Sequence, residues 1–217
     1  MTPCVVITRD RATYTRLSVA SLERFPDLDI HLVDHGSTYP PMLDYLDGSP
    51  HPVHRLEGRP PRALWDWDGL ARIVGTRREY VVTDPDLVFD TDCPPDWLTQ
   101  LREHLQCNPT STAKVGMGLR LDDLPDTPLA EKVRAWECLF WTARGVGRTW
   151  RAPVDTTLAL YPPLHGQPRF VLSPAVRMDA PYLMRHLPWY DDPAPDETAY
   201  YRDHALEGSS HWINGGW

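Results

Sequence analysis

Residues 4–22 read CVVITRDRATYTRLSVASL, and this stretch sets the class of fold. Its first five residues form an apolar run that predicts a buried strand. From residue 14, apolar positions at near-helical spacing predict a helix that stops at Phe25-Pro26. The alternation continues with predicted strands over 30–33 and 52–56 and with predicted helices over 41–46 and 64–78. Alternating strands and helices of this kind are typical of a mostly parallel sheet covered by helices.

The remaining sequence extends this pattern and then becomes less regular. Residues 79–89, EYVVTDPDLVF, predict a fourth strand that breaks at Asp84-Pro85-Asp86, and residues 94–105 predict a helix. Beyond residue 114, prolines separate predicted strands over 114–120, 155–161 and 175–178 from an aromatic-rich helix over 129–142. We find no repeat and no low-complexity linker. We therefore expect one α/β domain over 1–217 with a mostly parallel central sheet flanked by helices and an irregular second half.

Composition excludes several classes of protein. The 217 residues are 41% hydrophobic and 24% charged, which is typical of soluble globular domains. No apolar run is long enough for a membrane-spanning helix, and no basic segment precedes the first apolar stretch, so we expect a cytoplasmic protein without a transmembrane segment. Four cysteines without CxxC spacing disfavour a zinc knuckle and a disulfide framework. The net charge of -8 disfavours general nucleic-acid binding but allows a local basic groove.

The sharpest motif is the Asp84-Pro85-Asp86 triplet at the end of the apolar run Val81-Val82-Thr83. Two carboxylates at the carboxyl end of a buried strand lie where open α/β sheets bind their ligands. Mg²⁺ and Mn²⁺ are commonly held by one or two carboxylates together with substrate phosphates. A proline-bearing β-turn with aspartate as turn former is the structural alternative.

A second motif, Asp34-His35-Gly36-Ser37-Thr38, follows the apolar residues IHLV. At the end of a second parallel strand, a carboxylate can accept a hydrogen bond from a ribose hydroxyl or a base N–H. An Asp-Gly turn is the alternative for this motif alone. Together, a nucleotide edge near the start of the chain and a diphosphate-metal edge some fifty residues later describe a sugar-nucleotide site.

The order of these segments resembles the amino-terminal half of GT-A fold glycosyltransferases, especially the family 2-like group. The resemblance rests on CVVITRDRATYTRLSVASL, LVDHGST and VVTDPD, spans residues 4–120, and differs in having His35 where asparagine is more common. It implies a nucleotide-sugar-binding half over 1–112, an acceptor-binding half with the C-terminal tail over 113–217, and a nucleoside-diphosphate-sugar donor, with a UDP-sugar preferred. It also implies a Mn²⁺ or Mg²⁺ cofactor and transfer to an acceptor hydroxyl.

The resemblance also implies roles for individual residues. Thr8, Arg9 and Asp34 would contact the nucleotide, Asp84 would contact ribose and the cation, and Asp86 would bind the cation. A late histidine often completes the metal shell in this fold, and His186 is the best placed, with His211 as second choice. Arginines between the third strand and Asp84 could bind the diphosphate in a bidentate manner, and we select Arg59 and Arg72 from a set that also contains Arg55 and Arg62.

Inverting transfer requires a general base, usually Asp or Glu. The Glu-Asp pair that the family places at a helix start is not evident. Asp155 is our first candidate because it opens a predicted strand in the second half, Glu137 is the second, and Glu197 the third. Glu137 could instead be the partner of an arginine. The resemblance favours inverting chemistry.

The acceptor is left open between a glycan, a small molecule and a modified DNA base. The compact chain with its WExxFW and DTT segments also resembles small phage-type glycosyltransferases that accompany TET-like dioxygenases and act on 5-hydroxymethylpyrimidines in DNA. In that case an arginine-lined groove should lie beside Asp155. Three other classes compete. A nucleotidyltransferase of similar fold is one, although it usually has a Gly- and Lys-rich phosphate loop near the first strand, which ITRDRAT is not. VVTDPDLV resembles the nucleophile motif of haloacid-dehalogenase phosphatases, and a non-catalytic sugar-nucleotide-binding scaffold could keep the same fold.

Overall fold

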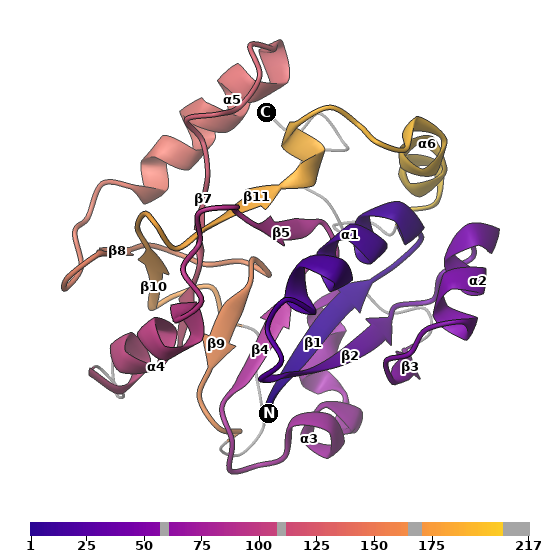
Figure 1. The fold of residues 1–217 in the computed structure, drawn as a ribbon, viewed down its shortest axis with the longest axis horizontal. Helices are drawn as coiled ribbons and strands as arrows, with labels where there is room; N and C mark the ends of the chain where they lie inside the picture. Colours follow the sequence, from indigo (N-terminus) through magenta and orange to yellow (C-terminus); the bar gives the residue numbers. More distant parts are fainter. Residues whose placement is uncertain (57–60, 108–111, 165–170, 206–217) are drawn as a thin grey trace.

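The central sheet is built around β1 (Thr2–Thr8), which is buried along its whole length (Figure 1). β2 (Leu28–Asp34) and β4 (Tyr80–Thr83) pair parallel on its two sides, and β3 (Val53–Arg55) pairs parallel with β2. Three of the four strands predicted in the first half are therefore confirmed, and of the fourth, predicted over 79–89, only residues 80–83 join this sheet. The coordinates are a computed structural model that describes residues 1–56, 61–107, 112–164 and 171–205.

Four strands of the second half extend the same sheet. β9 (Ala159–Tyr161) pairs antiparallel with β4 and with β6 (Lys114–Gly116), while β10 (Ala175–Met178) pairs parallel with β6 and antiparallel with β8 (Thr149–Arg151). The resulting order is β3-β2-β1-β4-β9-β6-β10-β8. A mostly parallel central sheet was predicted, and the structure confirms it.

A second, three-stranded sheet has the order β5-β11-β7 and contains β5 (Leu87–Phe89), β11 (Leu183–His186) and β7 (Gly118–Leu119). The single strand predicted over 114–120 is therefore wrong, because β6 belongs to one sheet and β7 to the other. The change occurs at Met117 and Gly118, whose amides bond to Leu158 and Tyr182 respectively. A Cβ at Gly118 would lie 2.5 Å from the Met178 carbonyl oxygen, so only glycine fits this close approach.

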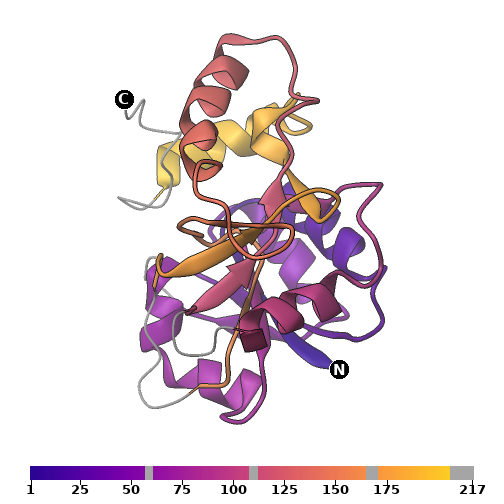
Figure 2. The same ribbon diagram turned by 90° about the vertical axis from the view of Figure 1, so that its left-hand side faces the viewer.

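Six helices cover the sheets within the described residues, and three short 3₁₀ turns accompany them. The helices are α1 (Ala12–Leu22), α2 (Pro40–Asp47), α3 (Asp68–Val74), α4 (Trp97–Cys107), α5 (Pro128–Glu137) and α6 (Pro195–His204). The 3₁₀ turns are Pro61–Asp66, Cys138–Phe140 and Leu187–Trp189. Figures 1 and 2 show α5 and α6 at the same end of the molecule, beyond the small sheet. None of the helices in the described part of the chain is long and apolar enough to cross a membrane.

Alternate residues of β1 enter two different cores. Cys4 and Val6 join the side chains of α1, α2 and α4, whereas Val5 and Ile7 join those of α3 and the preceding 3₁₀ turn. The side chains of these four residues are at most 3% exposed, because helices cover both faces of the strand. This packing fixes β1, β2 and β4 rigidly, and their carboxyl ends carry the polar residues described below.

Candidate functional site at the carboxyl edge of the sheet

The carboxyl ends of β1, β2 and β4 lie side by side. Thr8 is opposite Asp34 in the β1–β2 register, and Val6 is opposite Thr83 in the β1–β4 register. The structure thus brings Thr8, Asp34 and the Asp84-Pro85-Asp86 triplet to one edge of the sheet, where open α/β sheets bind ligands.

Asp84 is held in place by a neighbouring loop. Its amide donates to the Thr156 carbonyl at 3.0 Å, and the Thr156 hydroxyl donates to its carboxylate. Burial raises the pKa of Asp84 well above its usual value, and the negative charges of Asp86 and Asp155 raise it further. The Lys114 ammonium opposes this rise in the Asp84 pKa, and a bound cation would add a second positive charge that favours the ionised carboxylate.

Asp86 lies against His186, as the prediction of a shared cation site requires. β11 pairs antiparallel with β5, and His186 is opposite Leu87 in that register. The His186 Nε2 is 3.5 Å from the Asp86 Oδ1, and among the described residues this oxygen has no hydrogen-bond partner. Burial lowers the pKa of His186, which leaves a neutral imidazole that can bind a metal.

These donors fit a divalent cation. A carboxylate oxygen and an imidazole nitrogen suit Mn²⁺, and the partnerless Asp86 oxygen points to a missing ligand. In the part of the chain that the structure describes, no group of three or more His, Cys, Asp or Glu residues is placed to hold a metal ion, so the protein offers two ligands in this arrangement. The remaining coordination positions would fall to water or substrate phosphates, which is a usual way in which such cations are bound.

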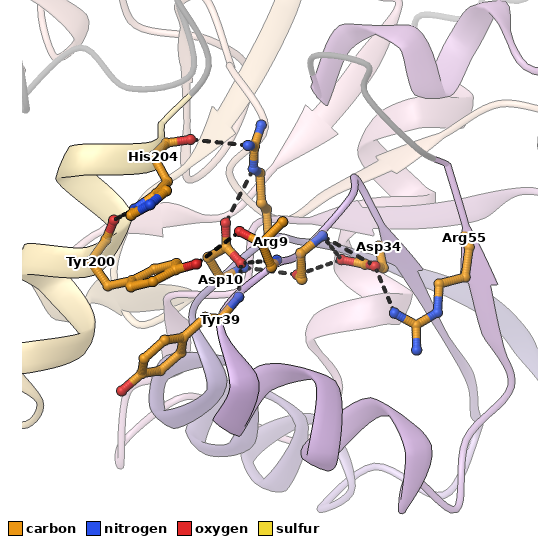
Figure 3. Close-up of polar contacts among 9 residues, drawn as sticks. Arg9, Asp10, Asp34, Tyr39, Arg55, Tyr200 and His204 are labelled. Atoms are coloured by element: carbon orange, nitrogen blue, oxygen red, sulfur yellow. Dashed lines mark hydrogen bonds and ion pairs between the residues drawn. The ribbon is translucent and has the colours of Figure 1, made fainter.

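The nucleotide edge is occupied by a network of internal hydrogen bonds (Figure 3). The Asp34 carboxylate accepts from the Ser37 amide and hydroxyl and from Arg55 at 3.2 Å. Thr8 is 1% exposed, and its hydroxyl is 2.7 Å from that of Thr15. These residues shape the edge, and their contact with a nucleotide remains a prediction.

Asp10 organises the same edge and was not predicted from the sequence. Its φ of 51° is unusual for a residue other than glycine, and its carboxylate accepts from the amides of Thr38 and Tyr39. Beside it, Arg9 donates to the His204 carbonyl at 2.9 Å, so its guanidinium faces α6 (Figure 3). The Asp in the ITRD segment was the available signal, since Asp tolerates this backbone conformation.

Helix α6 closes over this edge. In its first turn it carries the acidic residues Asp196 and Glu197, in the order Asp-Glu rather than the Glu-Asp order of the family. Glu197 is 2% exposed and accepts from the Thr13 amide at 2.8 Å, and Tyr14 donates to Asp192. A proline followed by two acidic residues is a helix-start signal that could have identified α6.

The candidate general bases occupy very different surroundings. Asp155 is exposed and directly precedes Thr156, which bonds to Asp84. Glu137 is buried and is the partner of Arg177 at 2.5 Å. The structure therefore brings Asp155 to the aspartate motif, and it places Glu137 in the arginine pair that the sequence left open as its alternative.

Of the two arginines predicted to bind the diphosphate, the structure describes Arg72 alone, and Arg72 does not lie at this edge. Arg72 is exposed near the end of α3, which leads to the amino end of β4, opposite to Asp84. Arg59 and His211 lie outside the described residues. Arg11, which the sequence analysis did not select, is instead 4.0 Å from the Asp86 carboxylate.

A cavity of about 510 Å³ lies at the outer side of the sheet beside β8. Among its lining residues are His104, Arg144 and Arg151, and none of the described lining residues is Asp or Glu. Arg151 is only four residues before Asp155 in the chain. Pro153 also lines the cavity, whereas Asp155 is not among its described lining residues, so an arginine-lined groove beside Asp155 stays a prediction.

Lys114 lies beneath the aspartate motif and is fully buried. Its ammonium donates to the Asp155 carbonyl at 2.9 Å and to the Tyr161 hydroxyl at 3.0 Å. Burial lowers the Lys114 pKa from 10.5 to about 8, although Asp155 and Asp84 oppose this shift. Lys114 thus supports the loop that carries Asp155 and Thr156.

This pKa predicts a pH-dependent stability. Above pH 8 the folded protein gives up the Lys114 proton while the unfolded chain keeps it until about pH 10.5, so Lys114 makes the free energy of unfolding rise with pH. We expect the difference between wild type and Lys114→Met to move in favour of the wild type by about 2 kcal/mol between pH 8 and 9.5. The two proteins must be compared because Cys4 and Cys93 lower the free energy of unfolding as the pH rises. Burial raises their pKa values to about 12, so in this pH range the folded protein keeps thiol protons that the unfolded chain loses. Urea unfolding at several pH values measures it, and a constant difference would contradict the prediction.

No family model matches the chain, and no curated protein matches it. Solved structures do resemble it. One is the galactosyltransferase LgtC in complex with donor and acceptor sugar analogs, with 13% identity, a TM-score of 0.40, and coverage of 74% of this chain and 58% of that chain. A second is 4-diphosphocytidyl-2C-methyl-D-erythritol synthase from Anaerococcus prevotii, with 13% identity, a TM-score of 0.38, and coverage of 58% and 59%. A third is HddC from Yersinia pseudotuberculosis, with 11% identity, a TM-score of 0.41, and coverage of 89% and 80%.

The chain spans less than two thirds of the length of the first two structures. With such identities, and with TM-scores below 0.5, function has to be argued from the site of this chain alone. Fold and site define an α/β protein whose central sheet, at the carboxyl end of β4, carries an aspartate motif facing a histidine.

Proposed function

We propose that the protein is a metal-dependent glycosyltransferase that moves a sugar from a nucleoside-diphosphate donor, preferably a UDP-sugar, to an acceptor hydroxyl with inversion. The observation that carries the proposal is the approach of Asp86 and His186, in which a buried carboxylate oxygen without a hydrogen-bond partner faces a neutral imidazole. Its position at the carboxyl ends of β1, β2 and β4 supports a nucleotide ligand.

Asp86 and His186 would hold Mn²⁺ or Mg²⁺, with Asp84 beside them. When bound, the cation would neutralise charge on the donor diphosphate and favour its departure. Thr8, Arg9 and Asp34 would border the nucleotide, although Asp34 must then exchange one of its present hydrogen bonds for a ligand contact. Thr156 and Lys114 keep the aspartate loop in position.

Asp155 is our proposed general base. It is exposed and next to the aspartate motif, so its carboxylate can accept the proton of an acceptor hydroxyl. Glu137 is bound to Arg177 and Glu197 to the Thr13 amide, which leaves both less available for proton transfer. Attack by the deprotonated hydroxyl on the face of the sugar opposite the diphosphate would invert the anomeric centre.

A titration with nucleotides tests the donor class. UDP, GDP, CDP and ADP are added with Mn²⁺ or with EDTA, and binding is followed by calorimetry and thermal shift. We expect one diphosphate, preferably UDP, to bind in the presence of Mn²⁺ and to lose most of its affinity in EDTA. Failure of all four to bind would contradict the proposal, and hydrolysis of a simple phosphate monoester would then support the phosphatase class.

The acceptor we consider first is a hydroxyl on a phosphate-bearing molecule such as a modified base in DNA. Residues 132–151 contain five basic residues and one acidic residue in a chain of net charge -8. Together with the arginine-lined cavity, this segment offers phosphate contacts. Binding of hydroxymethylated duplex that weakens with salt and is lost in an Arg144→Ala/Arg151→Ala variant would support DNA, whereas salt-independent binding would favour a glycan or small molecule.

A further inference from the structure

Arg11 has the properties of a ligand-binding residue. It lies between β1 and α1, and its side chain is only 9% exposed. Its guanidinium stacks on the ring of Tyr14 at 4.0 Å and on that of Tyr201 at 4.8 Å. Two aromatic rings thus fix the orientation of the guanidinium before any ligand binds.

The hydrogen-bonding capacity of this guanidinium is almost unused. Its Nη1 lies 4.0 Å from the Asp86 Oδ2, which is an ion pair beyond hydrogen-bond distance. Among the described residues its Nε has no hydrogen-bond partner. A buried Nε–H group on a cation is costly to leave unsatisfied, so the arrangement indicates an anion as its ligand.

The position of Arg11 identifies the anion. Asp86 lies between Arg11 and His186, so an oxygen bound to a cation on Asp86 and His186 would be within reach of the guanidinium. The planar fork of arginine matches two oxygens of a phosphate group. Resting on the proposed function, we propose that Arg11 binds the phosphate of the donor that carries the sugar.

This contact would strengthen during the reaction. The bond between the anomeric carbon and the phosphate oxygen breaks, its electron pair stays on that oxygen, and the leaving nucleoside diphosphate gains one negative charge. The acceptor oxygen forms the new bond to the anomeric carbon, and its proton passes to Asp155. A fixed guanidinium beside the leaving oxygen stabilises this developing charge.

A purely structural role is the competing explanation, because Arg11 also joins α1 to α6 through Tyr14 and Tyr201. The two roles differ in which nucleotide they affect. A phosphate-binding residue discriminates between UDP and UMP, whereas a structural clamp affects both nucleotides equally and lowers the melting temperature.

Calorimetry with UDP and UMP, each with Mn²⁺ and with EDTA, separates these roles. For Arg11→Met we expect about 10- to 100-fold weaker UDP binding and less than about threefold weaker UMP binding. Arg16→Met, which removes an exposed arginine of α1, is the matched control and should bind both nucleotides as the wild type does. Arg11→Lys keeps the charge between the rings but lacks the fork. It should show an intermediate loss for UDP, and it also serves as the test if Arg11→Met does not fold.

Equal losses for UDP and UMP, or no loss for either, would overturn the assignment of Arg11 while leaving the proposed function intact. If the wild-type protein binds another of the four diphosphates instead, that diphosphate and its monophosphate replace UDP and UMP in this test. Absence of binding of all four diphosphates by the wild-type protein would overturn the proposed function itself, and the assignment with it. The two failures are therefore distinguishable in the same set of titrations.

Discussion

Asp86→Asn is expected to abolish the Mn²⁺ dependence of nucleotide binding. Asparagine keeps the shape of the side chain but removes the charge, and the oxygen that faces His186 at 3.5 Å becomes a much weaker cation ligand. We expect Mn²⁺-dependent UDP affinity to fall about 100-fold or more, because a cation site with few protein ligands depends on each of them. Paramagnetic titration of Mn²⁺ with and without UDP measures this directly.

The matched control is Asp122→Asn, which removes an equal charge from a side chain that is 74% exposed and pairs with Arg120. It should bind Mn²⁺ and UDP like the wild type. Because Asp86 also pairs with Arg11, the melting temperature must be recorded for both variants. A folded Asp86→Asn protein with unchanged Mn²⁺ affinity would show that the cation binds elsewhere or is not required.

The first half of the fold could be predicted because the apolar residues of its strands are the ones that the structure buries. Val5 and Ile7 face one core and Cys4 and Val6 the other, so β1 is apolar at every position from Cys4 to Ile7, as strands covered on both faces are. The helix predicted over 64–78 is too long. The chain instead forms the 3₁₀ turn Pro61–Asp66 and then α3, which ends at Val74. Gly75 follows with a φ of 71°, which favours glycine.

Two elements of the second half could not be read from periodicity. Helix α6 has only Glu197 and Tyr201 buried, so it shows no apolar stripe, and its position depends on contacts with α1. Strand β8 is three residues long and follows Gly147, whose φ of 64° forms the preceding turn. Both elements are held by tertiary contacts that a local pattern does not contain.

In the candidate site, too, the positions of single residues in the chain could be predicted, but the tertiary contacts between them could not. Asp84, Asp86 and His186 could be selected because carboxylates after an apolar strand and a histidine after a later strand have recognisable positions in the chain. Their proximity depends on the antiparallel pairing of β5 and β11, which the sequence did not reveal. Arg11 and Lys114 were missed as site residues, because burial rather than residue type distinguishes them from other basic residues.

Arg177→Met is expected to destabilise the protein more than any surface substitution. Arg177 and Glu137 form an ion pair in which the side chains are 4% and 5% exposed, and the guanidinium packs on Phe140 with 4.9 Å to the ring centroid. Removing the arginine leaves a carboxylate buried without its partner, which costs about 3–5 kcal/mol. Urea unfolding at pH 7 should show this loss.

Arg144→Met provides the comparison, because Arg144 pairs with Asp179 through a side chain that is 64% exposed, and such surface pairs contribute about 0–1 kcal/mol. The double variant Glu137→Leu/Arg177→Met should regain most of the stability, since apolar side chains of similar size can replace a buried ion pair. Glu137→Gln then decides between the two roles of Glu137. If Glu137 is the partner of Arg177, the variant unfolds more easily and its folded fraction transfers sugar at the wild-type rate. A stable variant with lost transfer would identify Glu137, rather than Asp155, as the base.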